Sequence, residues 1–526
     1  MSPRPLIILL LFLATFAVAR SDVAAQALWP SLVALASVIA LRSALSGLLV
    51  GAATGVLILA DGNPATAFTA FFGKHLIPAL QSHWNLSVLI FTLLLGGFAA
   101  LLEKGRGFEA ILERLIQRGR DSGQRVQWSA YGMGILCFFD GLASSLLTGK
   151  ALRPLADRTG VSRAKLAYLV DSTSSAVACV AIMSTWIAYQ LSMIREGYAQ
   201  AGITEVKPFN VFLSSIPLNF YCWFTLLLLA VVITKNWNCG PMAHAETTPK
   251  SMADDPAGEA GPSSGIVGVV LPLLALIASL LIGLYWNGAE GGFFPVTFSK
   301  AMDAFGNAAA ADILVYSSVI GCGVAFFTNY NAIAEHARPA TVFLDGVQRF
   351  FIPCLILIAA WCLSSTLKQL EASKFLAGML GSNFSPALFP VTVFAVGVLI
   401  SFTTGTSWGT MGVMMPLVIP IALNLDASVI PGTVAAVFSG AVFGDHCSPL
   451  SDTTIVSSVA CDLDPVDHVR TQLPYALIAA TLACLIGFIP AGFGVPAVIC
   501  LAAGAGIIIS LPNLHRRMAS PGDQDE

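Results

Sequence analysis

The chain has 526 residues, of which 56% are hydrophobic and only 11% are charged. Soluble domains carry about 25% charged residues, so this composition excludes an ordinary soluble protein. The formal net charge of −3 excludes a nucleic-acid-binding protein, which would present a basic surface. We therefore predict one membrane domain, because many segments reach the roughly 20 apolar residues that cross a bilayer as a helix.

The first segment has the layout of a secretory signal. Arg4 precedes an apolar run over residues 6–19, and Ala25 and Ala27 form an A-x-A site. This order predicts that residues 1–27 are a cleaved signal peptide, with an uncleaved signal-anchor as the alternative.

A polar linker divides the rest of the chain into two halves. Residues 247–264 are rich in Pro, Gly and acidic residues, and we expect them in the cytoplasm. The first transmembrane half is then 28–246 and the second is 265–511. Residues 512–526 form a short tail, also expected in the cytoplasm.

Two basic loops, 103–125 and 150–165, flank a mostly apolar segment. Lys and Arg mark cytoplasmic loops, so both ends of this segment should lie on the cytoplasmic side. A re-entrant hairpin over 126–149 satisfies both loops, whereas a single span does not. The hairpin contains Asp140, and a carboxylate at membrane depth costs about 2.5–3.5 kcal/mol on insertion scales. We expect Asp140 to be an ion-coupling acid; the alternative is that it caps backbone amides at the hairpin tip.

A run of five polar residues, Asp171-Ser-Thr-Ser-Ser175, follows inside an apolar stretch. Ser and Thr side chains compete for backbone hydrogen bonds, so we expect the run to interrupt its helix. Asp171, Ser172 and Thr173 are then candidate oxygen ligands for a hard cation. The alternative is a helix start capped by Asp171.

A similar polar segment occurs in the second half, where residues 401–410 read S-F-T-T-G-T-S-W-G-T. It predicts a second hairpin over 388–424, entered from the periplasmic side, with Thr404 and Ser407 as oxygen donors. About eleven spans and two hairpins follow, which places the C-terminus in the cytoplasm. Interruptions at matching positions of the two halves predict an inverted repeat with a site near the membrane midplane.

The densest polar segment, residues 444–458, reads G-D-H-C-S-P-L-S-D-T-T-I-V-S-S. Pro449 lacks a backbone donor and so frees a carbonyl that could become a ligand. The candidate ion-coupling residues of this segment are Asp445, His446, Ser448, Asp452 and Thr453. His446 suits proton relay. Neighbouring His and Cys residues are poorly spaced for zinc, so we expect no bound metal cofactor. Cys447 with His446 leaves an intramembrane enzyme as a remote alternative.

The 444–458 segment resembles the NhaC family of sodium/proton antiporters. The element Asp467–Ala476, D-H-V-R-T-Q-L-P-Y-A, and the 401–410 stretch are also similar to that family, and the resemblance extends from about residue 85 to 480. It implies a multi-pass inner-membrane transporter, not an enzyme and without a cofactor, that exchanges Na⁺ for H⁺ by alternating access.

Related members of that family exchange organic acids. A sodium- or proton-coupled exchanger of organic acids or amino acids is therefore the alternative function. The resemblance is incomplete in the first hairpin, where the family reads F-F-D-D-Y-x-N and this chain has Gly141 in place of the second carboxylate. The expected partners are Na⁺, H⁺ and the lipid bilayer, and a homodimer stays open.

Overall fold

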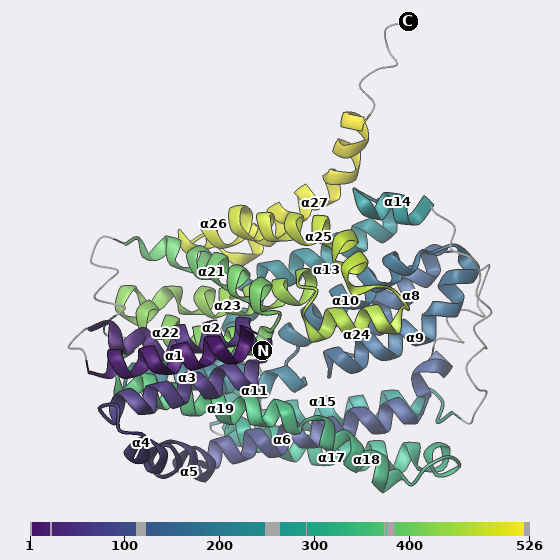
Figure 1. The fold of residues 1–526 in the computed structure, drawn as a ribbon. Helices are drawn as coiled ribbons and strands as arrows, with labels where there is room; N and C mark the ends of the chain where they lie inside the picture. Colours follow the sequence, from purple (N-terminus) through teal and green to yellow (C-terminus); the bar gives the residue numbers. More distant parts are fainter. Residues whose placement is uncertain are drawn as a thin grey trace, which may run out of the picture.

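The computed structural model describes residues 3–20, 24–111, 123–247, 263–290, 292–372, 375 and 384–519. All regular structure in those ranges is helical (Figure 1). Nine of the described helices are long and apolar enough to cross a membrane, and the number is twelve if each of three bent pairs counts as one span. The prediction of an all-helical polytopic membrane protein is confirmed. The predicted number of about eleven spans lies between these two counts.

The first half begins with three short apolar helices. These are α1 (Pro3–Ala19), α2 (Trp29–Leu41) and α3 (Ala44–Leu59). The helices α2 and α3 pack closely because Gly51 faces Ala34, where an added Cβ would lie 2.5 Å from the alanine side chain. The expected signal segment thus forms α1, which packs on α3. Its cleavage stays a prediction.

The remaining helices of the first half are α4 (Pro64–Ala70), α5 (Ile77–Gln81), α6 (His83–Lys104), α8 (Gly123–Leu136), α9 (Gly141–Thr159), α10 (Arg163–Val180), α11 (Thr185–Gln200), α12 (Pro208–Ser215), α13 (Phe220–Lys235) and α14 (Pro241–Thr247). The second half contains α15 (Val267–Gly288), α16 (Phe298–Asn307), α17 (Ala310–Ala334), α18 (Pro339–Arg349), α19 (Phe351–Gln369), α21 (Phe389–Thr404), α22 (Ser407–Leu425), α23 (Ile430–Cys447), α24 (Asp452–Ala460), α25 (Pro465–Leu482), α26 (Ile489–Gly492) and α27 (Ala497–Ala519).

Two groups of helices pack against each other across this fold. The helices α6, α15, α17 and α18 form one group, which runs along the lower side of Figure 1. The helices α8–α11, α13 and α21–α25 form the other group. The second group contains every interrupted helix pair described below, so the first group serves as a scaffold beside it.

Four interruptions separate helices that follow one another in the chain. They lie between α8 and α9, between α10 and α11, between α21 and α22, and between α23 and α24. A polar residue precedes each second helix, namely Asp140, Ser184, Thr406 or Ser451, and the first three accept hydrogen bonds from backbone amides of the helix they cap. Gly405 ends α21 with φ +66°, a conformation that favours glycine.

The prediction that Asp171–Ser175 interrupts its helix is wrong. These residues lie inside α10, and the break comes later, at 181–184, where α10 and α11 bend by 48°. The hydroxyl of Thr173 bonds to the carbonyl oxygens of Leu169 and Val170. Such bonds run along the helix that carries the hydroxyl, so they satisfy the side chain without opening the backbone.

The two predicted hairpins correspond to helix pairs. The segment 126–149 forms most of α8 and the first half of α9, which pack side by side. The segment 388–424 forms α21 and α22, and each of these helices is long enough to cross a membrane. Most of the predicted linker 247–264 and the end of the predicted tail 512–526 lie outside the described residues. The hairpins and the inverted repeat stay predictions.

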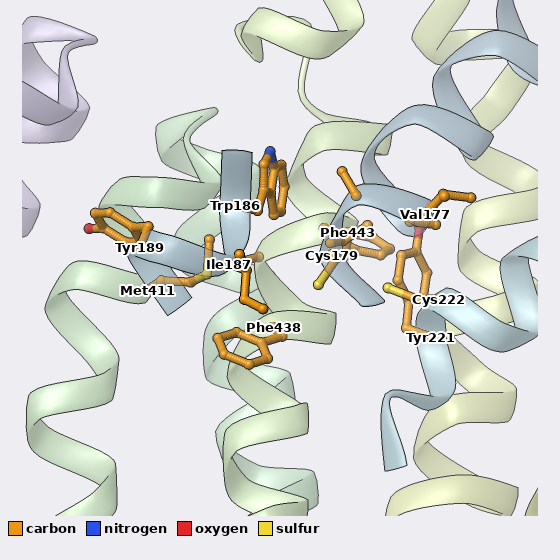
Figure 2. Packing of buried hydrophobic residues seen from close by; sticks show 14 of the residues in the cluster. Val177, Cys179, Trp186, Ile187, Tyr189, Tyr221, Cys222, Met411, Phe438 and Phe443 are labelled. Carbon is orange, nitrogen blue, oxygen red and sulfur yellow. The ribbon is translucent and has the colours of Figure 1, made fainter. Parts of the chain in front are cut away.

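The interior around the α10–α11 break is packed with large side chains. Figure 2 shows Trp186 and Ile187 on α11 beside Phe438 and Phe443 on α23. All four are buried, with at most 5% of their surface exposed. Close packing of this kind holds the polar groups at the break in fixed positions.

Candidate ion-binding site

A cavity of about 400 Å³ lies where the interruptions converge. It is lined by six of the eleven residues that the sequence singled out: Asp140, Thr404, Ser407, Asp445, Asp452 and Thr453. These residues come from the α8–α9 pair, from the α21–α22 pair and from the α23–α24 break. The other five predicted residues do not line this cavity: Asp171, Ser172, Thr173, His446 and Ser448.

Asp140 lies at the start of α9 with 6% of its surface exposed. Its Oδ2 accepts from the backbone amide of Ala143 at 3.1 Å, and its Oδ1 accepts from the hydroxyl of Thr185 at 3.2 Å. The amide of Thr185 also donates to the carbonyl of Phe139 at 2.8 Å. Asp140 therefore caps its own helix, as the alternative interpretation proposed, and at the same time presents a carboxylate to the cavity.

Asp445 supplies the second carboxylate and is 2% exposed. Its Oδ1 accepts from the hydroxyl of Ser451 at 3.0 Å, and Ser451 in turn contacts the hydroxyl of Thr453 at 2.9 Å. Its Oδ2 accepts no well-aligned hydrogen bond from the described residues, although the side chain of Ser407 interacts with the carboxylate. A buried carboxylate oxygen without a donor is unfavourable unless a cation or a proton occupies it.

The carbonyl freed by Pro449 is that of Asp445, four residues earlier. Proline has no amide hydrogen to continue the helix, so α23 ends at Cys447. The hydroxyls of Thr453 and Thr454 bond to this carbonyl, the former at 3.4 Å. The hydroxyls therefore tie the first turn of α24 to the end of α23, and the carbonyl is not a free ligand.

The rim of the cavity differs in charge from its floor. Arg42 and Arg349 line it and are exposed, and Arg349 forms an ion pair of 2.8 Å with Glu103 at the end of α6. The floor contains the two buried carboxylates. The exposed carboxylate of Asp452 lines the same cavity, so a cation that enters past the exposed residues meets charges of both signs before Asp140 or Asp445.

A smaller cavity of about 240 Å³ lies farther along α11, where Arg195 and Trp361 line it. Arg195 is ten residues beyond Thr185, or roughly 15 Å along the helix. Two hydrogen bonds involve residues of α11 between Thr185 and Arg195. The hydroxyl of Tyr189 donates to the carbonyl of Trp408 at 2.6 Å, and the indole of Trp361 donates to Ser192 at 2.5 Å.

Asp171 belongs to a different cluster, which is fully enclosed. Its Oδ1 accepts from Ser457 at 3.0 Å and its Oδ2 accepts from Gln472 at 2.8 Å, while the Nε2 atom of His468 lies 3.3 Å from Oδ2. Ser457 also bonds to Ser145 of α9 at 3.0 Å.

His446 and Ser448 are buried beside the end of α23. The Nδ1 atom of His446 bonds to the hydroxyl of Tyr221 at 2.8 Å. The Ser448 hydroxyl accepts from the amide of Leu450 at 3.3 Å. Ser448 therefore stabilises the turn between α23 and α24, whereas His446 joins α23 to α13.

Sequence reasoning missed several residues of these sites. Thr185, Thr406 and Trp186 line the cavity, and His468 and Gln472 contact Asp171. The polar pair Ser184-Thr185 within an apolar stretch was the only local signal for the α10–α11 break. The contacts of His468 join residues 297 positions apart, which no local pattern indicates.

A membrane-embedded cavity built from interrupted helices, with buried carboxylates on its floor, defines a secondary transporter. The model of the Na⁺/H⁺ antiporter family matches residues 177–493. This chain belongs to the Na⁺/H⁺ antiporter family, as the NhaC resemblance implied.

Individual relatives agree with this assignment. An uncharacterized protein of Haemophilus influenzae is 32% identical over 474 residues, which cover 88% of this chain and 90% of that protein. The Na⁺/H⁺ antiporter NhaC of Alkalihalophilus pseudofirmus is 36% identical over 151 residues, covering 27% of this chain and 30% of that one. The malate-2H⁺/Na⁺-lactate antiporter of Bacillus subtilis is 37% identical over 111 residues, covering 20% and 24%.

The fold is similar to that of a solved transporter. The YdaH transporter of Alcanivorax borkumensis, described as having an unusual topology, aligns with a TM-score of 0.60. The alignment covers 84% of this chain and 91% of that one at 16% identity.

Proposed function

We propose that this protein exchanges Na⁺ for H⁺ across the inner membrane by alternating access. The observation that carries the proposal is the convergence of Asp140 and Asp445 on one cavity from the two halves of the chain. Oxygen atoms are the ligands that hard cations prefer, and the hydroxyls of Thr404, Ser407 and Thr453 line the same space. In this mechanism Na⁺ occupies the Oδ2 side of Asp445.

The described conformation fits the inward-facing state of such a cycle. Arg349 at the rim pairs with Glu103, next to the basic segment 103–125 that we expect in the cytoplasm. On the opposite side, the contacts of Tyr189 and Trp361 close the route along α11. Opening these contacts while closing the rim would expose the carboxylates to the periplasm. The C-terminus lies in the cytoplasm in this orientation.

A second candidate cargo is a small organic acid or amino acid. The cavity volume of about 400 Å³ exceeds the space that a bare cation needs, and the walls include apolar side chains such as Leu45, Ile352 and Ile356. The two rim arginines would attract a carboxylate group. The name of the Bacillus subtilis relative includes both sodium and organic acids, which favours keeping this candidate.

Purified protein in liposomes with an enclosed pH-sensitive dye separates the two candidates. A sodium pulse outside the vesicles should change the internal pH if Na⁺ and H⁺ are the cargo. Organic acids should neither be required for this signal nor be transported with sodium. A pH change that occurs only when an organic acid is present would contradict sodium/proton exchange and support the second candidate.

A further inference from the structure

Asp171 and His468 face each other inside the protein, away from the cavity. Both side chains are 0% exposed. Neither of them lines the cavity of about 400 Å³ that contains the candidate cation site. Gln472 and Ser457 donate to the carboxylate, whereas both ring nitrogens of His468 lack a properly aligned hydrogen-bond partner among the described residues. The Nε2 atom of His468 nevertheless lies 3.3 Å from Oδ2 of Asp171, so a proton on the imidazole would complete an ion pair between the two side chains.

We propose that Asp171 and His468 form an enclosed proton site, separate from the cation site, that communicates with it through α24. This inference rests on the proposed function. A proton adds to the imidazole of His468 to form an N–H bond, and the resulting imidazolium pairs with the carboxylate of Asp171. The pair is then electrically neutral. When that bond breaks and the proton leaves, the pair carries one negative charge.

The short helix α24 connects this pair with the cavity. Asp452 and Thr453, at its start, line the cavity, and Thr454 bonds to the carbonyl of Asp445. Ser457, one turn later, bonds to the carboxylate of Asp171. A change at the pair therefore reaches the cation site within about 5 Å of helix. A buried negative charge is unfavourable in isolation, so loss of the proton favours a cation in the cavity.

Several other ionisable groups face Asp171 from the helices packed against it. On α23, Asp445, His446 and Cys447 interact electrostatically with Asp171, as does Cys461 at the end of α24.

The remaining neighbours lie on four further helices. On α10, Arg163 pairs with Asp157 and Asp462, and Lys165 bonds to Asn238. Tyr168 stacks on Tyr475 of α25, and Tyr221 of α13 bonds to His446. On α9, Ser145 reaches the cluster through Ser457, and Arg153 interacts with Cys461. The pair thus has a single imidazole in direct contact with the carboxylate.

Equilibrium binding of radioactive sodium to the purified protein, measured across a pH series, tests the proposal. In the unaltered protein, each linked proton weakens sodium binding by up to about tenfold for each unit by which the pH falls, and both the pair and the carboxylates of the cavity contribute linked protons. The variants His468→Gln and Asp171→Asn should still bind sodium, but the pH dependence of the affinity should be weaker by one linked proton, because only the carboxylates of the cavity still contribute. Retained binding also shows that each variant is folded.

The matched control is His83→Gln, because His83 is an exposed histidine at the start of α6. It should keep the pH dependence of the unaltered protein. The proposal is overturned if His468→Gln keeps the full pH dependence of the unaltered protein, or if it loses sodium binding altogether while staying monodisperse. The proposed function survives either result. If the unaltered protein binds no sodium, the proposed function fails, and this inference fails with it.

Discussion

The hydroxyl of Thr185, the first residue of α11, donates to the carboxylate of Asp140 at 3.2 Å. This bond joins the tip of the α8–α9 pair to the broken helix α10–α11. A second bond, from the amide of Thr185 to the carbonyl of Phe139, reinforces it at 2.8 Å. The two elements therefore hold the first carboxylate of the site together, and movement of α11 would move Asp140.

Replacing Thr185 by valine keeps the side-chain shape and removes the hydroxyl. A hydrogen bond to a charged group contributes about 1.5–3 kcal/mol, so we expect sodium-driven proton flux in liposomes to fall by about tenfold or more. Thr185→Ser should restore most of the flux because it restores the hydroxyl. Thr403→Val is the control, since Thr403 is exposed and bonds only to its own helix. Normal flux in Thr185→Val would show that this bond does not support transport.

Replacement by alanine should affect the stability of the protein differently at two glycines of the α8–α9 pair. A Cβ on Gly134 would lie 2.1 Å from the hydroxyl oxygen of Thr173, whereas the nearest atom to a Cβ on Gly141 is the carbonyl oxygen of Ser174 at 3.4 Å. Overpacking of a close contact destabilises a protein by about 1–3 kcal/mol. Thermal unfolding in detergent should show a clearly lower midpoint for Gly134→Ala and almost no change for Gly141→Ala. Equal midpoints would contradict the close packing of α8 on α10.

The rim arginines distinguish the two candidate cargoes. Arg42→Gln and Arg349→Gln each remove a positive charge from the cavity entrance. Exposed charge interactions contribute about 0.2–1 kcal/mol, so the apparent affinity for sodium should rise by up to roughly fivefold if sodium enters alone. The gain should shrink at high ionic strength, where the charges are screened. A loss of uptake in these variants, with an organic acid as substrate, would instead indicate an anionic cargo.

Much of the cavity could be predicted from local sequence. Gly405 ends α21 and is followed by the capping hydroxyl of Thr406, and Pro449 prevents α23 from continuing. Both segments form breaks that line the cavity. Asp140 was recognised because a carboxylate in an apolar segment requires a specific environment. These features depend on neighbours within a few residues, so a single sequence contains them.

The parts that could not be predicted depend on distant contacts. The polar run of α10 suggested a break, but the hydroxyls of Thr173 and Ser174 bond to carbonyls of the same helix. The actual break is fixed partly by the bond from Thr185 to Phe139, which joins two helices. Likewise, Asp171 meets His468 only because α10 packs on α25. Neither contact has a signature in the local pattern of residues.

The central claim is that buried carboxylates of this cavity couple sodium to protons, and the flux assay on Asp445→Asn tests it most directly. Asparagine is nearly isosteric but has no charge and does not titrate in this range. We predict that sodium-driven proton flux is abolished in Asp445→Asn and unchanged in Asp303→Asn, which alters an exposed carboxylate on α16. Sodium-driven proton flux at the level of the unaltered protein in Asp445→Asn would contradict the account.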